Sequence, residues 1–355
     1  MATIRDVAKH AGVAPTTVSH ALSGKRQVAE ATRARILHAA EELHYHPDAI
    51  ARSLRSGRTR TVGLSLPLDI PGYTLIHTLF PEFIVHIADR LNNRDHKLLC
   101  LVSRTPETDD LRRLARAGEV DGMILLQVRL DDPRITALRA VGLPFVAIGR
   151  PADSRSVVSV DADLAAAGVL AAKHLFSLGH QRIGFLGDAP MFGYQRHALA
   201  GFRRAHREAG VPLRNAQLLG LRPSGGLRGA LAPFLATTQP LTALITTSEV
   251  EAVSALHVLT DAGLRVPEDV SIINLGDSTL VQLARPPITV VGFSVLDESN
   301  LAVDLLLQLL DGHTPRTNTH IIPVQLLSRQ STGPADPSRS GRRLMSVDTM
   351  LLERG

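Results

Sequence analysis

The N-terminal region contains the segment Thr3-Ile4-Arg5-Asp6-Val7-Ala8-Lys9-His10-Ala11-Gly12-Val13-Ala14-Pro15-Thr16-Thr17-Val18-Ser19-His20-Ala21-Leu22. Thr3 and Asp6 have the spacing of a helix N-cap and its partner, and apolar residues follow at helical intervals. A first helix is expected to run to about His10, and Gly12 supplies the left-handed residue that ends it. Pro15 suits the first position of a second helix, because the N–H that proline lacks has no helical partner there.

The second helix has an apolar and a polar face. Val18 and Leu22 are expected to point into a core. The exposed side carries short hydrogen-bonding side chains, which suit a DNA groove: Thr16, Thr17, Ser19 and His20. A third helix is predicted over residues 32–43, with Ile36 at its apolar centre. Residues 1–47 therefore predict a small all-α helix-turn-helix domain.

Positive charge is concentrated near the N-terminus. Residues 1–60 hold ten Lys or Arg and five acidic residues, an excess equal to the net charge of +5 of the whole 355-residue chain. The remaining residues therefore sum to zero. A basic module joined to a neutral body is expected of a domain that binds phosphates, although arginine is also the preferred basic residue throughout the chain.

The N-terminal module resembles the DNA-binding domain of the lactose-repressor and galactose-repressor family. The spacing of the shared residues is continuous from residue 3 to residue 47. The shared phrases are Thr3-Ile4-x-Asp6-Val7-Ala8-x-x-Ala11-Gly12-Val13, Thr17-Val18-Ser19, Val28-x-x-x-Thr32-Arg33 and Leu43-x-Tyr45-x-Pro47. The resemblance implies a sequence-specific DNA-binding transcriptional regulator, expected to be a repressor.

The resemblance also implies roles for individual residues. Pro15, Thr16 and His20 match positions that face base edges in the major groove. Positions that hold backbone phosphates are matched by Thr3, Thr17, Ser19, Ser23 and Thr32. Ile4 belongs to the same predicted DNA-binding set. Ala14 stands where the family usually has a Ser N-cap, and His20 where it often has Arg. The operator sequence of other members therefore does not carry over.

Residues 48–60 are expected to form a hinge helix and linker. Residues 48–57 are too few for a helix that is stable alone in water. In the family this segment folds on the operator, and the residue that matches Leu54 wedges into the minor groove. Ala51, Arg52 and Arg55 belong to the same predicted DNA-binding set. The alternative is that Leu54 is an ordinary core residue.

After residue 60, apolar runs alternate with helical stretches. Strands are predicted over residues 61–68, 97–102, 122–128 and 145–149, and again over 182–187, 243–247 and 270–276. Helices are predicted between them, over residues 163–178, 196–209 and 250–262. Parallel strands with crossover helices follow from this alternation, in two similar α/β lobes.

The body resembles the same family and, through it, periplasmic sugar-binding proteins. The anchoring phrases are Ala172-x-His174-Leu175-x-x-Leu178-Gly179-His180, Gly263-Leu264-Arg265-Val266-Pro267-Glu268-Asp269-Val270-Ser271-Ile272, Pro286-Pro287-Ile288-Thr289-x-Val291 and Ser328-Arg329-x-Ser331-Thr332. The resemblance implies an α/β two-lobed, periplasmic-binding-protein-like effector-binding and dimerisation domain over residues 61–332. Lobe one takes 61–160 and 293–322, and lobe two takes 161–292 and 323–332. The chain is expected to cross between the lobes near Val160, Gly292 and Pro323, and closure around an effector to reposition the DNA-binding domains of a dimer.

Small ligands bind at the strand ends of open α/β sheets, which identifies candidate effector contacts. They are Leu68, Tyr73, Arg150, Asp161, Asp163, Phe192, Arg196, Ser248, Glu249 and Asp277. Each of them could equally be a cap or turn residue.

The effector site departs from the family pattern. Ala198 stands where an Arg commonly holds the ligand, with Arg196 nearby but out of register. Ser248-Glu249 replaces the common Asn-Asp, and Gly276 removes a carboxylate. Because each lost hydrogen-bond partner costs about 1–3 kcal/mol, a plain hexose is expected to bind poorly. The effector would be a modified or phosphorylated sugar, another small metabolite, or absent; the alternative is an ordinary sugar held by a rearranged set of polar residues.

The sequence also bears on other classes of protein. A phosphate-binding Gly loop with Lys and a Gly-x-Ser-x-Gly elbow are missing, so no enzyme, catalytic residue, metal or cofactor is expected. A solute-binding receptor without DNA function would need an export signal and would leave the basic N-terminal module unexplained. The expected location is the cytoplasm, associated with the nucleoid and not with a membrane. The single cysteine, Cys100, lies in an apolar run and is expected to be buried and inert.

Residues 333–355 are rich in Pro, Ser and Arg, and a disordered tail is expected there. A homodimer is expected, because a pseudopalindromic double-stranded DNA operator presents two half-sites one turn apart.

Overall fold

A computed structural model describes residues 2–23, 26, 28–45, 58–67, 69–70, 73–74, 79–103, 107–187, 192–219, 226–235 and 240–336. The chain forms two compact units, Met1–Arg60 and Thr61–Gly355. Within the described ranges, no helix combines the length and the apolar character needed to span a bilayer.

The described residues of the first unit form the helices α1 (Ile4–Ala11), α2 (Pro15–Ser23) and α3 (Glu30–Glu42). The predicted start of α1 is confirmed, because the Thr3 N–H donates to the Asp6 carboxylate at 2.8 Å while the Asp6 N–H donates to Thr3 Oγ1. Gly12 ends α1 in the left-handed region, with φ of 63°. The third helix begins two residues earlier than expected.

A small apolar core holds these helices together. Val7 of α1, Val18 of α2 and Ile36 of α3 are fully buried. A hydrogen bond at the surface adds a link between α1 and α3, with His10 Nε2 at 2.7 Å from a Glu42 carboxylate oxygen. The polar face of α2 is therefore carried on a packed scaffold.

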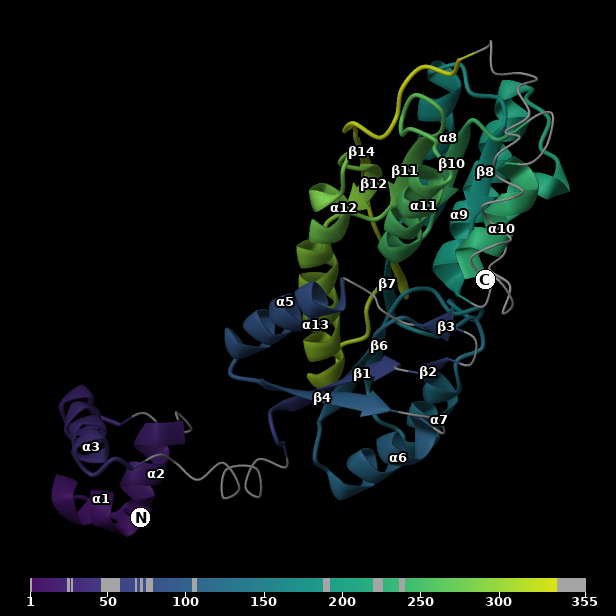
Figure 1. Ribbon diagram of the computed structural model, residues 1–355. Helices are drawn as coiled ribbons and strands as arrows, with labels where there is room; N and C mark the ends of the chain where they lie inside the picture. Colours follow the sequence, from purple (N-terminus) through teal and green to yellow (C-terminus); the bar gives the residue numbers. More distant parts are fainter. Residues whose placement is uncertain are drawn as a thin grey trace. The chain divides into compact units, whose positions relative to one another are not determined.

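The second unit consists of two lobes, each built on a six-stranded sheet (Figure 1). The sheet of lobe one has the order β13-β7-β6-β5-β1-β4, and its paired strands run parallel. Its strands are β1 (Thr61–Pro67), β4 (Lys97–Ser103), β5 (Gly122–Leu125), β6 (Phe145–Ile148), β7 (Ser159–Ala162) and β13 (Thr319–Ile322). Beside it lies a short antiparallel pair, β2 (Asp69–Ile70) and β3 (Tyr73–Thr74).

Lobe two repeats this plan with the strand order β14-β12-β11-β10-β8-β9. Only β14, among these strands, runs antiparallel to its neighbour β12. The strands are β8 (Ile183–Leu186), β9 (Leu218–Leu219), β10 (Ala243–Thr246), β11 (Ser271–Leu275), β12 (Thr289–Phe293) and β14 (Val324–Leu327). The expectation of two α/β lobes with parallel strands is confirmed.

Helices cover both faces of each sheet. In lobe one, α5 (Phe80–Asn92) and α13 (Val295–Leu310) share one core with the sheet, and α6 (Glu107–Ala117) and α7 (Pro133–Val141) share another. In lobe two, α8 (Leu164–Ser177) and α9 (Gly193–Ala209) cover one face. The other face is covered by α10 (Gly226–Leu235), α11 (Glu249–Asp261) and α12 (Thr279–Leu283); a 3-10 turn, η1 (Asn215–Gln217), precedes β9.

The chain passes between the lobes after β7, after β12 and at Pro323 between β13 and β14. The first passage lies two residues later than expected, because Asp161 and Ala162 continue the pairing of β7 with β13. Asp161 therefore belongs to lobe one.

The expectation for Cys100 is wrong, and the start of the predicted tail moves by a few residues, while residues 337–355 lie outside the described residues. Cys100 is exposed, because β4 forms an edge of its sheet and its run of apolar residues is not covered on both sides. The chain also stays packed for a few residues beyond 332, since the Ala335 N–H donates to the Leu178 carbonyl at 2.8 Å and the Gly333 carbonyl lies 3.0 Å from His180 Nε2.

Candidate effector cleft and DNA-binding surface

The structure distributes the predicted DNA contacts over the three helices of the first unit. Pro15 and Thr16 are exposed at the start of α2, and Thr3 is exposed ahead of α1. Thr17, Ser19, His20 and Thr32 are partly exposed. Ile4 packs against the core of the unit. The side chain of Ser23 and all of Ala51, Arg52, Leu54 and Arg55 lie outside the described residues.

The start of α2 reflects the unusual Ala14. Its carbonyl oxygen accepts the N–H of Thr17 at 2.9 Å and that of Val18 at 3.2 Å. Alanine has no side-chain oxygen with which to cap the helix, so the first turn of α2 depends on backbone bonds alone. A phosphate oxygen at this position would supply the missing acceptor.

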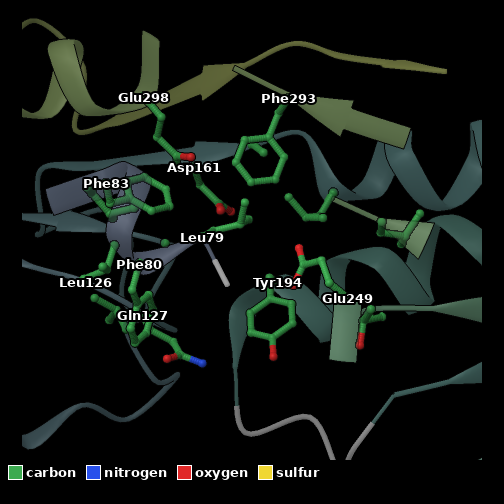
Figure 2. Close-up of a pocket in the computed structure, with 17 residues that line it drawn as sticks. Leu79, Phe80, Phe83, Leu126, Gln127, Asp161, Tyr194, Glu249, Phe293 and Glu298 are labelled. Atoms are coloured by element: carbon green, nitrogen blue, oxygen red, sulfur yellow. The ribbon is translucent and has the colours of Figure 1, made fainter. Parts of the chain in front are cut away.

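A cavity of about 110 Å³ lies between the lobes, and most of its wall is apolar (Figure 2). Lobe one contributes Asp161 at the end of β7 and Glu298 of α13, and lobe two contributes Glu249 at the start of α11. The wall thus joins strand ends and helices of both lobes, as expected for a ligand that is enclosed when they close. Of the ten predicted effector residues, Asp161 and Glu249 line this cavity.

Asp161 is held by an ion pair at the cleft edge of lobe one. Arg150 Nε donates to its carboxylate at 2.8 Å, and the side chain of Asp161 is only 6% exposed. Burial raises the pKa of Asp161 to about 6, although the Arg150 charge and hydrogen bond act in the opposite direction. Arg150 itself is not part of the cavity wall.

Glu298 is a second buried acid, which sequence reasoning missed. Burial raises the pKa of Glu298 well above its usual value, and the charge of Asp161 raises it further. Figure 2 shows both carboxyl groups directed toward the same part of the cavity. A signal was present in the sequence, because Glu298 occupies the apolar stripe of its helix together with Val295 and Ala302.

The third acid explains a departure from the family pattern. Gly276 has φ of 126°, and a Cβ atom built on it would lie 2.7 Å from Glu249 Oε1. The carboxylate of Glu249 therefore lies beside the position where a side chain on residue 276 would begin. The site keeps an acidic group there in spite of the glycine.

Among the other predicted effector residues, none whose side chain is described lines the cavity. Asp163 caps α8 by accepting the Ala166 N–H at 2.9 Å. Arg196 is exposed on α9. Asp277 pairs with Arg329 at 2.7 Å. The ring of Phe192 is buried and stacks on Tyr194, Ser248 precedes α11 as its N-cap, Leu68 is outside the described residues, and of Tyr73 only the backbone is described.

A fully buried ion pair shapes one wall of the cavity. Asp132 caps α7 and lies 2.8 Å from Arg134, and both side chains are 0% exposed. Arg134 also donates to the carbonyl groups of Leu126 and Gln127. Gln127 lines the cavity in a left-handed conformation, with φ of 52°. The ion pair therefore fixes a backbone conformation that residues other than glycine rarely adopt.

Two family descriptions match this chain. Residues 3–48 match "Bacterial regulatory proteins, lacI family", and residues 172–332 match "Periplasmic binding protein-like domain". HTH-type transcriptional regulator AglR of Rhizobium meliloti is 31% identical, over 95% of this chain and 96% of its own length. HTH-type transcriptional repressor PurR of Haemophilus influenzae (strain PittEE) is 33% identical, over 87% of this chain and 91% of its own.

Solved structures agree with this assignment. A complex of the transcriptional regulator CelR with cellobiose has a TM-score of 0.69 and 27% identity, covering 93% of this chain and 100% of that chain. The lac repressor dimer bound to operator and the anti-inducer ONPF has the same fold, with a TM-score of 0.77 and 22% identity over 94% of this chain and 99% of that chain. A solute receptor without DNA function does not account for the match over residues 3–48. The chain belongs to the lacI family of bacterial regulatory proteins and is a transcriptional regulator with a helix-turn-helix DNA-binding domain and a two-lobed ligand-binding domain.

Proposed function

We propose that the protein is a repressor that binds a pseudopalindromic operator as a homodimer, and that a small effector in the cleft controls this binding. The observation that carries the proposal is the cavity lined from both lobes, in the same chain as a basic three-helix module. A ligand that touches both lobes binds best where both can reach it, so it shifts the population between open and closed arrangements. Operator affinity changes with that population.

In this proposal, base edges are read by Pro15, Thr16 and His20, and phosphates are held by Thr3, Thr17, Ser19, Ser23 and Thr32. The hinge contacts proposed for Ala51, Arg52, Leu54 and Arg55 rest on the family resemblance. His20 is a shorter, single-point donor or acceptor, so the base pair that it contacts is expected to differ from one read by Arg.

The test begins by selecting binding sites from random DNA with the full-length protein. Affinity for the selected site is then measured against salt, where each neutralised phosphate adds roughly 0.9 to the log-log slope. His20→Ala is expected to weaken binding by about 1–3 kcal/mol and to relax preference at one base pair. His38→Ala is the matched control, because His38 is exposed on α3 and pairs only with Glu42 of its own helix among the contacts described. Equal affinity for selected and random DNA would refute the proposal.

A further inference from the structure

The charged side chains that line the cavity are all acidic. They are Asp161 and Glu298 of lobe one and Glu249 of lobe two. Within the described part of the chain, no Lys, Arg or His contributes to the wall. Arg150 lies close by, but its Nε is engaged with Asp161 at 2.8 Å. The titratable side chains of the wall are therefore all carboxyl groups, which favour a cationic over an anionic ligand.

Glu298 is buried in the cavity wall without a described partner for its carboxyl group. It is 3% exposed, and among the described residues no hydrogen bond or ion pair reaches that group. A polar group that is buried without a partner costs free energy, and such groups in native proteins usually have a partner that is a protein atom, a water or a ligand. Figure 2 shows Glu298 directed into the cavity, where a ligand would meet it.

The rest of the wall defines the remainder of the ligand. The cavity is lined by Phe80 and Phe83 of α5 and by Phe293 at the end of β12, and Tyr194 of lobe two lies on its other side. In Figure 2 the hydroxyl of Tyr194 points away from Glu298 and Asp161, so the ring and not the hydroxyl faces them. Aromatic rings favour apolar bodies, and their faces also attract cations.

We propose that the effector is a small organic cation, in which a protonated amine is carried on a compact apolar body. The ammonium group donates hydrogen bonds to the carboxyl groups of Glu298, Asp161 and Glu249, and the body packs among the aromatic rings. Anionic ligands, including phosphorylated sugars, are repelled by the same three acids. Neutral hydroxyl compounds can hydrogen-bond to the carboxyl groups but gain no attraction between opposite charges. This inference rests on the proposed function of the cleft as the effector site.

The experiment uses three probes of nearly the same shape, benzylamine, benzyl alcohol and benzoate, with the full-length protein. A second pair, glucosamine and glucose, tests the same exchange of amine for hydroxyl on a polar body. Binding is measured by calorimetry and by thermal stabilisation at neutral pH. Benzylamine is expected to bind at least about tenfold more tightly than benzyl alcohol, and benzoate not at all at millimolar concentration.

Glu298→Gln keeps the shape of the side chain but cannot ionise opposite an ammonium group, so it is expected to abolish the preference for benzylamine over benzyl alcohol. Asp297→Asn is the matched control, because Asp297 is exposed on the next position of α13. The inference is overturned if alcohols bind as tightly as amines, if neither amine binds at millimolar concentration, or if Glu298→Gln keeps the preference. Operator binding is measured on the same preparations. Its loss would refute the proposed function, whereas intact operator binding without amine preference refutes only this inference.

Discussion

The two lobes share a sheet topology, but they bury polar clusters at opposite ends of their strands. In lobe one, Arg134 and Asp132 lie at the carboxyl ends of β1 and β5, beside the cavity. In lobe two, His180 lies within 3.1 Å of the hydroxyl groups of Thr242 and Ser271, at the amino ends of β8, β10 and β11. Of these two clusters, only the one in lobe one is placed to act on the effector site.

The clusters also differ in charge. Burial alone would raise the pKa of Asp132, but the charge and hydrogen bonds of Arg134 bring it below its usual value. The pKa of His180 is lowered, chiefly by burial, so the cluster in lobe two is neutral. A buried charge that loses its partner is far more costly than a neutral group that loses one hydrogen bond. The same fold therefore has one fragile point next to the cavity and one more tolerant point away from it.

The largest expected effect comes from Arg134→Met, which leaves Asp132 buried and unpaired. The free energy of unfolding is expected to fall by about 3–5 kcal/mol, measured by urea denaturation of the full-length protein. Arg139→Met on the same helix is the control, because Arg139 is 42% exposed and its ion pair with Asp153 is long, at 3.8 Å.

An equal loss in both variants would show that α7 is sensitive to any arginine replacement, and the contrast between the lobes would then fail. A selective loss in Arg134→Met should be accompanied by faster amide exchange at Gln127, because Arg134 donates to the Gln127 carbonyl at 3.2 Å. That second readout ties the buried charge to the cavity wall.

A smaller effect is expected where the lobes touch. Phe192 of lobe two forms an isolated β-bridge with Arg129 of lobe one. A Cβ atom at Gly193 would lie 2.3 Å from the carbonyl oxygen of Arg150. Gly193→Ala is therefore expected to push the lobes apart and to disfavour their contact by about 1–3 kcal/mol.

The effect of Gly193→Ala is measured by amide hydrogen exchange. Exchange is expected to be faster at residues 129, 150 and 192 and unchanged elsewhere in lobe two. Ala200→Ser is the control, since Ala200 is exposed on the same helix, α9. Unchanged exchange at the bridge would mean that the lobes accommodate the methyl group without separating.

Sequence reasoning reached the elements more reliably than the cavity. The strands around Ile124 and Ile245 and the capping box of Thr3 depend on neighbours in the chain, so their patterns are visible in it. The role of Glu298 depends on its proximity to Asp161, which lies more than 100 residues earlier in the chain. No local sequence pattern predicts that these two residues line one cavity. Cys100 was misjudged for the same reason, because an edge strand and a central strand carry similar apolar runs.

The smallest predicted effect is a difference between the lobes in how their stability depends on pH. Among the described residues, four histidines have a pKa lowered by burial, and all lie in lobe two: His174, His180, His197 and His206. For His197 the pKa falls to about 4. The described carboxyl groups of lobe one whose pKa is raised are Asp161, at about 6, and Glu298.

The signs of these shifts are opposite. A histidine whose folded pKa is depressed takes up its proton more readily in the unfolded chain. Its contribution to the stability of the protein is therefore present above pH 6.5 and is lost as the pH falls toward the folded pKa. A carboxyl group whose folded pKa is raised takes up its proton more readily in the folded chain, and acidification therefore favours folding. Lowering the pH from 7 to 5 should loosen lobe two and spare lobe one.

Hydrogen exchange resolved by lobe, combined with thermal unfolding at pH 7, 6 and 5, measures this difference, and a fall of a few °C in the midpoint is expected. His180→Asn should lower stability at pH 7, because the bonds to Thr242 and Ser271 are weakened, and should make the further loss on acidification shallower. His313→Asn, which replaces an exposed imidazole in lobe one, should leave the slope unchanged. If acid loosens both lobes equally, or if His180→Asn keeps the full slope, the acid sensitivity does not arise from the buried histidines of lobe two, and the contrast between a charged and a neutral cluster would have to be restricted to the energetics of Arg134.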